Sequence, residues 1–398
     1  MTEPTRSSSY RFGTFELQPN ERRLLAGGEP VVLGPRAFDL LVALVERPGQ
    51  LVTKKELRSA RLEEKRDSSA STAVKAEVQA AAKGRGENAE AYRLYLQGQF
   101  FVAQRTQASL ATGIEYFRQA VGLDPEYALA WAALASAQSI EAGAGWTSYG
   151  EGHRHAREAA ERALALEPDL AEGHAALGQI CLLHDWDWSG ADASSRRALE
   201  LAPGNAGVVL RAAFVPGFLG RLDESIALCR RVIVLDPLNV QGHRHLGRFS
   251  LLAGFLDQAE AALKEALKLN PQGGLGTYEH LGEVYLVQGR FAEALAAFEK
   301  ESDEGLRLLG LSVAYHALGR KAQSSAALEQ LSELPVHAFL NAQGNAYLGK
   351  VDQAFEWLAR AYTQRNAGLC QIKLAPLLRN LHGDPRWQLF LKKMGFAD

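Results

Sequence analysis

The feature that most constrains this chain of 398 residues is a set of prolines that recur at nearly equal spacing. Successive prolines are separated by 43, 35, 34 and 34 residues, at Pro125, Pro168, Pro203, Pro237 and Pro271. A period of about 34 residues is typical of arrays in which every unit is a pair of helices. One pair cannot bury its apolar face alone, so neighbouring units stack into a superhelical solenoid. The sequence therefore predicts a mainly α-helical array of a kind that usually binds partners and rarely performs chemistry.

Small residues recur at fixed positions within each period. When the proline is counted as position 32, Gly247 and Ala259 fall at positions 8 and 20 of one unit, and Gly282 and Ala294 at the same positions of the next. Glycines also stand where the chain would turn between the two helices of a unit, namely at Gly220, Gly289 and Gly319. Such turns favour a positive φ, which glycine adopts at little cost. The pattern resembles the tetratricopeptide repeat (TPR), with seven to eight units.

Three further stretches carry a more specific resemblance. They lie at residues 184–190, 352–362 and 383–396. All three are similar to the TPR arrays attached to bacterial winged-helix regulators. The resemblance implies TPR repeats over 89–336, followed by a last repeat and C-terminal capping helices over 337–398 that end the solenoid with a polar surface.

A nine-residue excess interrupts the period in the second unit, around residues 141–150. Insertions in solenoids usually lie in loops, so we expect a longer turn between the two helices of this unit. The general rule favours a tolerated surface insertion. The alternative is a loop that touches a ligand at the rim of the array.

The N-terminal residues predict strands rather than helices. Aromatic and β-branched residues over 10–17 predict one strand, with a bulge at Gly13-Thr14 where the alternation shifts. Gly27-Gly28 stands between two apolar segments, which predicts a hairpin.

Signals for two helices follow this hairpin. Pro35 suits the first position of a helix, and Thr53 with Glu56 forms a capping box for a second one. Strand, hairpin and two helices resemble the start of an OmpR/PhoB-type, CadC-like winged-helix transcriptional regulator over residues 9–60. The resemblance implies a small α+β module whose second helix begins with residues that contact DNA phosphates. By position these candidates are Thr53, Lys54, Lys55 and Arg58.

The winged-helix pattern is incomplete after Ala60. Residues 61–88 show no wing hairpin, and they are either an alanine-rich linker or a degenerate recognition helix that extends the module to residue 84. Such a helix would present Lys75, Gln79 and Lys83, without the arginines that often read base edges. We therefore expect DNA binding to be weak or lost.

One charged group of residues is a candidate partner site in the concave groove of the array. Arg244 and Arg248 fall at groove-facing positions 5 and 9 of the fifth unit, and Glu279 and Glu283 at the same positions of the sixth. They could form a bipolar groove that binds a charged protein segment or peptide. The alternative, which the spacing favours, is an Arg–Glu ladder between adjacent helices that pairs within itself.

Catalytic and metal-binding patterns are missing from the sequence. His153 and His155 are two residues apart, so on a helix they point roughly 200° apart, whereas zinc requires three or four converging ligands. The histidines are therefore expected to be surface or packing residues with satisfied nitrogens. Cys181 and Cys229 fall at packing positions, which predicts buried inert thiols. We expect no metal, no cofactor and no enzymatic activity.

Composition limits the compartments and the classes of partner that we expect for this protein. The net charge of −2 gives no overall field that attracts nucleic acid, and the three cysteines imply no disulfide framework. No apolar run approaches the ~18 residues that a membrane-spanning helix requires, so a cytoplasmic protein without a membrane partner is expected. The leading hypothesis is a transcriptional-regulator-like protein that joins a winged-helix remnant to a protein-binding TPR solenoid. The alternative is a TPR scaffold with no DNA binding.

Overall fold

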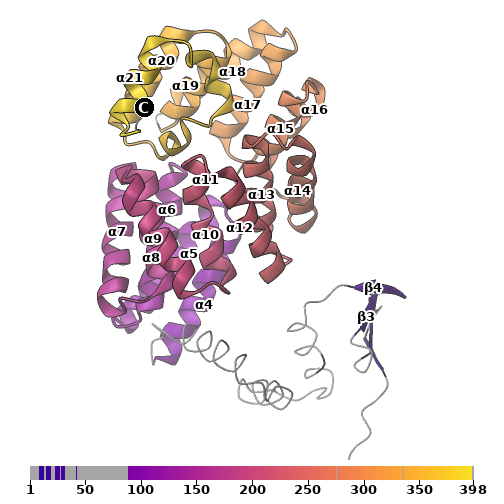
Figure 1. Cartoon of the computed structure of the whole chain (residues 1–398), viewed down its shortest axis with the longest axis vertical. Coiled ribbons are helices and arrows are strands. Elements are labelled where there is room, and N and C mark those ends of the chain that lie inside the picture. Colours follow the sequence, from indigo (N-terminus) through magenta and orange to yellow (C-terminus); the bar gives the residue numbers. More distant parts are fainter. Residues whose placement is uncertain are drawn as a thin grey trace, which may run out of the picture. The chain divides into compact units, whose positions relative to one another are not determined.

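The computed structural model describes residues 9–12, 15–18, 23–26, 28–31, 42, 88–274, 276–334 and 336–396. The chain divides into two compact units, residues 1–79 and 80–398. The first contains short strands, and the second contains the helical array (Figure 1).

Four strands of the N-terminal unit form one antiparallel sheet in the order β1-β2-β3-β4. Their bounds are Tyr10–Phe12 for β1, Phe15–Gln18 for β2, Arg23–Ala26 for β3 and Glu29–Val31 for β4. The expected hairpin is confirmed, because β3 pairs with β4 with Leu24 opposite Val31. The expected single strand over 10–17 is wrong: Phe12 pairs with Phe15, so the chain reverses where a bulge was predicted. A bulge and a tight turn shift the alternation of side chains in the same way, so the sequence does not distinguish them. The strand pairing shows that this is a turn.

Helices of the second unit follow one another as eight antiparallel pairs among the described residues, which we number repeats 1 to 8. Their bounds are α4 Ala89–Ala103 and α5 Gln107–Leu123; α6 Ala128–Gly143 and α7 Tyr149–Leu166; α8 Ala171–Ile180 and α9 Trp188–Leu201; α10 Ala206–Ala212, α11 Phe214–Phe218 and α12 Leu222–Leu235; α13 Val240–Leu252 and α14 Leu256–Leu269; α15 Thr277–Val287 and α16 Phe291–Phe298; α17 Glu304–Ala317 and α18 Lys321–Glu333; α19 Ala338–Tyr347 and α20 Val351–Thr363. The predicted helix pairs and their period are therefore confirmed.

Glycine residues perform both of the predicted roles in this array. The turns between paired helices contain Gly220, Gly289 and Gly319, with φ of 89°, 76° and 74°. At the helix crossings, the ring of Phe298 in α16 lies against Gly282 of α15 and Gly310 of α17, and a methyl group at either glycine would overlap that ring. Glycine at these crossings therefore lets three consecutive helices pack around one buried phenylalanine.

Repeat 4 has its first helix in two pieces, α10 and α11. Pro216 has no N–H to donate to the carbonyl of Ala212, one turn earlier. Buried hydroxyl groups satisfy the carbonyls at the break instead: Ser195 donates to Ala212 O at 3.1 Å, and Ser225 donates to Ala213 O at 2.6 Å. Neighbouring helices thus compensate for the interruption.

Repeats 2 and 3 depart from the regular turn. The insertion in repeat 2 lies in the segment from the end of α6 to the start of α7, as predicted, and it also lengthens both helices. In repeat 3, α8 ends in a π-helical turn, η1 Cys181–Asp185, followed by Trp186 in the left-handed region with φ of 55°. A tryptophan there is uncommon.

The C-terminal segment packs along the array rather than only at its end. It contains the 3₁₀ helices η2 Ala367–Gln371 and η3 Pro376–Leu381 and the helix α21 Pro385–Lys393. η2 touches α6 and η1, more than 180 residues earlier in the chain. In Figure 1 the yellow C-terminal part lies next to the half of the array that contains α6. One face of the segment is apolar, since Leu369, Ile372, Leu378 and Leu381 are each 0% exposed. Arg379, Arg386, Lys392 and Lys393 are exposed, and the expected polar cap stays a prediction. The C-terminal segment therefore packs back across earlier repeats through an apolar face.

Candidate functional site

Four residues predicted to line the concave groove are brought together by two neighbouring helices. α13 presents Arg244 and Arg248 one turn apart, and α15 presents Glu279 and Glu283 in the same way. His280 lies among them: Arg244 Nη1 is 3.4 Å from His280 Nε2, and Arg248 Nη1 is 3.0 Å from His280 Nδ1. We call Arg244, Arg248, Glu279, His280 and Glu283 the charged cluster.

The charged cluster is more deeply buried than an open groove would allow. Glu279, His280 and Glu283 are only 7%, 5% and 6% exposed. Burial raises the pKa of Glu279, and the nearby charges of Arg248 and Arg244 offset part of that rise. Burial also raises the pKa of Glu283, as does the adjacent Glu279 carboxylate. Both carboxyl groups therefore hold their protons more tightly than exposed glutamates do.

His280 is kept neutral by the same surroundings. Burial lowers its pKa well below the usual value, and the charges of Arg248 and Arg244 lower it further. The cluster therefore sets two guanidinium groups against two carboxyl groups across a neutral ring. The burial of the carboxyl groups does not fit an exposed bipolar groove. The Arg–Glu ladder stays a prediction, because the hydrogen bonds of Arg248 join it to His280 and Gln371.

Glu301 is a buried carboxylate that sequence reasoning missed. It is 3% exposed and follows α16. It accepts hydrogen bonds from the backbone N–H of Gly276 at 3.3 Å and of Glu279 at 3.1 Å, at the start of α15. A carboxylate at a helix N-terminus is favourable because it meets unpaired N–H groups and the positive end of the helix dipole. It fixes the helix that carries the glutamates, and the local sequence gives no sign of it.

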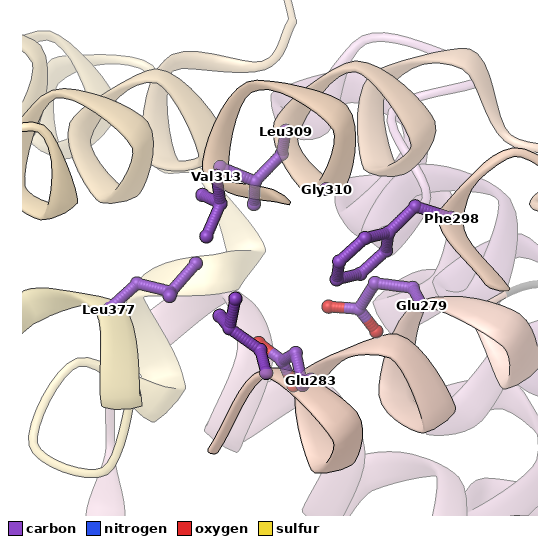
Figure 2. Close-up of a pocket in the computed structure, with 8 residues that line it drawn as sticks. Glu279, Glu283, Phe298, Leu309, Gly310, Val313 and Leu377 are labelled. Atoms are coloured by element: carbon purple, nitrogen blue, oxygen red, sulfur yellow. The ribbon is translucent and has the colours of Figure 1, made fainter. Parts of the chain in front are cut away.

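The protein's own C-terminal segment covers the charged cluster. Arg248 donates from Nη2 to the side-chain oxygen of Gln371 in η2. Figure 2 shows Leu377 of η3 facing Glu283 and the ring of Phe298 across a small gap. The cavity between them has a volume of ≈ 10 Å³, which is at the ~10–15 Å³ limit for holding one water molecule. The face expected to receive a partner therefore already holds a chain segment.

A second set of long-range contacts joins repeat 3 to the end of the chain. Trp186 packs against Tyr362 with ring centroids 5.1 Å apart. Trp188 donates from Nε1 to the carbonyl of Met394 at 3.1 Å and stacks on Phe396 at 4.5 Å. We call these five residues the C-terminal clasp. The three stretches that resembled regulator-linked arrays, 184–190, 352–362 and 383–396, are thus the parts of the chain that meet here.

The inserted turn of repeat 2 contacts the same end of the chain. The hydroxyl of Tyr149 donates to the carbonyl of Val336 at 3.0 Å, and Asn366 Nδ2 donates to the Tyr149 oxygen at 3.2 Å. Tyr149 is buried, and burial raises its pKa above the usual value. The insertion therefore has an intramolecular role, and neither interpretation drawn from the sequence included it.

The histidines differ in part from the expectation of satisfied packing residues. His153 is fully buried and stacks on His184 with ring centroids 4.8 Å apart. Both of its ring nitrogens are without a hydrogen-bond partner. Burial lowers the pKa of His153 to about 3, and the neighbouring His184 contributes to that shift. It is a packing residue, but an unsatisfied one.

One group of buried side chains has the spacing of a metal site. Ligand atoms of Glu279, His280 and Glu283 lie within 4.8 Å of one another. The same His280 ring is contacted by Arg244 and Arg248, whose positive charges oppose the binding of a cation. We therefore interpret this group as part of the charged cluster and assign no metal to it.

The cysteine prediction is confirmed by burial. Cys181, Cys229 and Cys370 are all buried free thiols. Burial raises the pKa of Cys229 and of Cys370 to about 12, and it also raises that of Cys181. A thiol that stays protonated is a poor nucleophile.

The candidate DNA-contacting residues lie outside the described residues. They are Thr53, Lys54, Lys55, Arg58, Lys75 and Lys83. Among the helices that are described, none has both the length and the apolar character needed to cross a bilayer.

Comparison with known proteins supports the repeat assignment. The model of the tetratricopeptide repeat family matches residues 218–274 and 253–305, which include the whole of α12 to α16. Together with the helix pairs on either side, this gives a mainly helical, TPR-like solenoid. No relative was found among curated proteins.

Several solved structures are similar in fold. The human IFIT1 dimer with PPP-AAAA is 13% identical, with 65% of this chain and 69% of that chain covered and a TM-score of 0.49. Yeast Tom70 is 14% identical, with 91% and 81% covered and a TM-score of 0.42. PilF of Pseudomonas aeruginosa is 19% identical, with 53% and 97% covered and a TM-score of 0.39.

Proposed function

We propose that this protein is an interaction scaffold that holds a segment of a partner protein against the first helices of repeats 5 to 7. The observation that carries the proposal is the chain's own segment over 367–381, which rests on the charged cluster. Its presence supports the idea that this face binds a short polypeptide segment with 3₁₀-helical turns. Solenoids offer such continuous surfaces because each repeat adds one more helix to the face.

The contacts made by residues 367–381 indicate which side chains a partner segment would need. An amide or carboxylate side chain would take the place of Gln371 at Arg248. A leucine-sized apolar side chain would take the place of Leu377 beside Phe298. A partner must compete with a segment tethered to the same chain, whose effective concentration is ~mM for short flexible linkers. Binding of a partner therefore requires that residues 367–381 are released, or that the partner binds more tightly than they do.

A labelled peptide with the sequence of residues 367–381 tests this proposal. The full chain carrying Gln371→Ala and Leu377→Ala should bind the peptide in fluorescence anisotropy, because its own segment is held less tightly. Adding Arg248→Ala should weaken that binding about tenfold, since a hydrogen bond to a charged group contributes ~1.5–3 kcal/mol. Arg230→Ala, on the outer helix α12, is the matched control.

The outcome against the proposal is equally direct. If a scrambled peptide of the same composition binds as well, or if Arg248→Ala changes nothing, the face does not recognise a polypeptide segment. Circular dichroism of each variant establishes that the array is folded before binding is measured.

A second candidate function is DNA-linked regulation. The observation that favours it is the β3–β4 hairpin, which lies where the resemblance to an OmpR/PhoB-type winged helix predicts one. We propose that Lys54 and Lys55 contact phosphates with dissociation constants in the non-specific range of ~10⁻⁴–10⁻⁶ M. Replacing both by alanine in the full chain should then lower affinity equally for all sequences and make the log–log salt slope shallower. A nanomolar footprint on one operator would contradict this weak, sequence-blind mode.

The proposed compartment is the cytoplasm. Three free, buried cysteines suit a reducing environment, where disulfides are rare. Fractionation of cells that express the full chain would test this.

A further inference from the structure

The first helix of the array exposes an apolar stripe. Tyr92, Leu96 and Phe100 of α4 are 39%, 48% and 65% exposed. They are four residues apart, so they lie on one face of the helix. Together they expose on the order of 300 Å² per copy if a large side chain offers ~150–250 Å². Patches of a few hundred Å² on soluble proteins often mark interaction sites.

The position of α4 explains why this face has no helix packed on it among the described residues. The first helix of every later repeat packs against the second helix of the repeat before it, as α6 does on α5 and α8 on α7. Within the described residues, α4 packs on α5 and touches α6. Its remaining face is the one that a preceding helix would cover, and in Figure 1 α4 lies at the edge of the array.

The order of residues along this face is the same in both directions. From Leu96, an aromatic residue lies four positions away on each side, Tyr92 and Phe100. An exposed alanine follows at seven positions on each side, Ala89 and Ala103. Two antiparallel copies of α4 would therefore place Leu96 against Leu96, aromatic against aromatic and alanine against alanine. Self-complementarity of this kind is what an interface with two-fold symmetry requires.

Charges beside the stripe do not oppose this pairing. Arg93 is bound to Glu90 on its own helix, with a 2.9 Å hydrogen bond. In the antiparallel arrangement centred on Leu96, the residue opposite Arg93 is Gln99 and the residue opposite Glu90 is Val102. No like charges meet directly.

From these observations we infer that a second copy of this chain docks on the Tyr92–Leu96–Phe100 face of α4 in an antiparallel, two-fold arrangement. A helix of this length extends ~22 Å, and the apolar area is below the ~1,200 Å² total of standard stable interfaces. The dimer is therefore weak and concentration-dependent. The inference is independent of the proposed partner site, because α4 carries none of the residues of the charged cluster.

Sedimentation equilibrium of the full chain tests the association. A monomer–dimer equilibrium is expected at micromolar concentration. Leu96→Glu with Phe100→Glu should abolish it by placing four carboxylates in the interface. Val234→Glu with Leu238→Glu is the matched control, because these apolar residues are 81% and 74% exposed elsewhere in the array, and it should leave the dimer intact.

Cross-linking tests the geometry. All three native cysteines are buried, so Leu96→Cys supplies an accessible thiol next to the two-fold axis. Mild oxidation should link two Leu96→Cys chains by a disulfide, whereas Gln97→Cys, one position around the helix, should not react above background. A monomer at every concentration, as when another part of the chain or a different protein covers this face, would overturn the inference. So would a dimer that survives Leu96→Glu with Phe100→Glu, or equal cross-linking at both positions.

Discussion

His153 should make the array sensitive to acid, and the size of the effect follows from its burial. The side chain is 0% exposed, and its pKa falls from 6.5 to about 3 in the folded protein because burial disfavours the charged form. A base with a lowered folded pKa contributes its stability fully above the unfolded value and loses it as pH falls through 6.5 toward 3. The unfolded chain binds the proton and the folded chain does not.

The expected change can be worked from this shift. Each pH unit below 6.5 costs about 1.4 kcal/mol, down to the folded pKa. Between about pH 7.5 and about pH 5, His153 therefore removes about 2 kcal/mol from the free energy of unfolding. His153→Phe keeps a ring in the stack with His184 and removes the titration. Any packing cost of the larger ring is the same at both pH values and cancels from the difference.

The measurement is denaturant unfolding of both proteins at the two pH values, followed by circular dichroism. The free energy of unfolding of His153→Phe relative to the native chain should rise by about 2 kcal/mol on going from about pH 7.5 to about pH 5. His153→Leu is the matched control, since it removes the same ring nitrogens without adding a larger ring, and its relative stability should rise by the same amount. If native and His153→Phe stabilities fall in parallel, burial of His153 does not control its protonation and the reasoning fails.

Two further predictions concern the interior of repeats 5 to 7. Gly310→Ala should destabilise the protein by about 1–3 kcal/mol, because the added methyl group overlaps Phe298. Phe298→Leu in the same chain should restore part of the loss. Thermal melts of the single and double variants measure this, and no recovery in the double variant would contradict it. Glu283→Gln should behave oppositely to His153→Phe with pH. A carboxyl group whose pKa is raised in the folded protein loses its stabilising contribution as pH rises from the unfolded pKa through the folded pKa. The Glu283→Gln variant should therefore gain stability relative to the native chain between about pH 5 and about pH 7.5. An unchanged difference in the free energy of unfolding would contradict the raised pKa.

Local sequence pattern predicted the helix pairs, because their determinants recur every period. Gly247 and Gly282 were predicted to lie at helix crossings and Gly289 at a turn, from their positions in the repeat alone. The same reasoning placed Arg244 and Glu279 on adjacent helices. Periodicity could not show what covers them, since the contact between Arg248 and Gln371 joins residues 123 positions apart.

The C-terminal clasp also could not be predicted from a local sequence pattern. Trp186 and Trp188 were recognised only as part of a resemblance, because their partners lie some 175–210 residues further along the chain. No helical or strand period encodes such a pairing. The expectation of a capping end did not include these contacts for the same reason, because no local pattern shows that the last residues also pack on repeat 3.

The hydrogen bond from Trp188 to Met394 also sets an order of events during synthesis. A chain emerges from the ribosome N-terminus first, and its domains generally begin to fold in that order. Repeat 3 has been synthesised long before residue 394 is made. Trp186 and Trp188 therefore lack these contacts while five more repeats are synthesised. Closing a contact across about 200 residues carries an entropy cost that local helix pairing does not. Residues made about 200 positions later are therefore the ones that finish the third repeat.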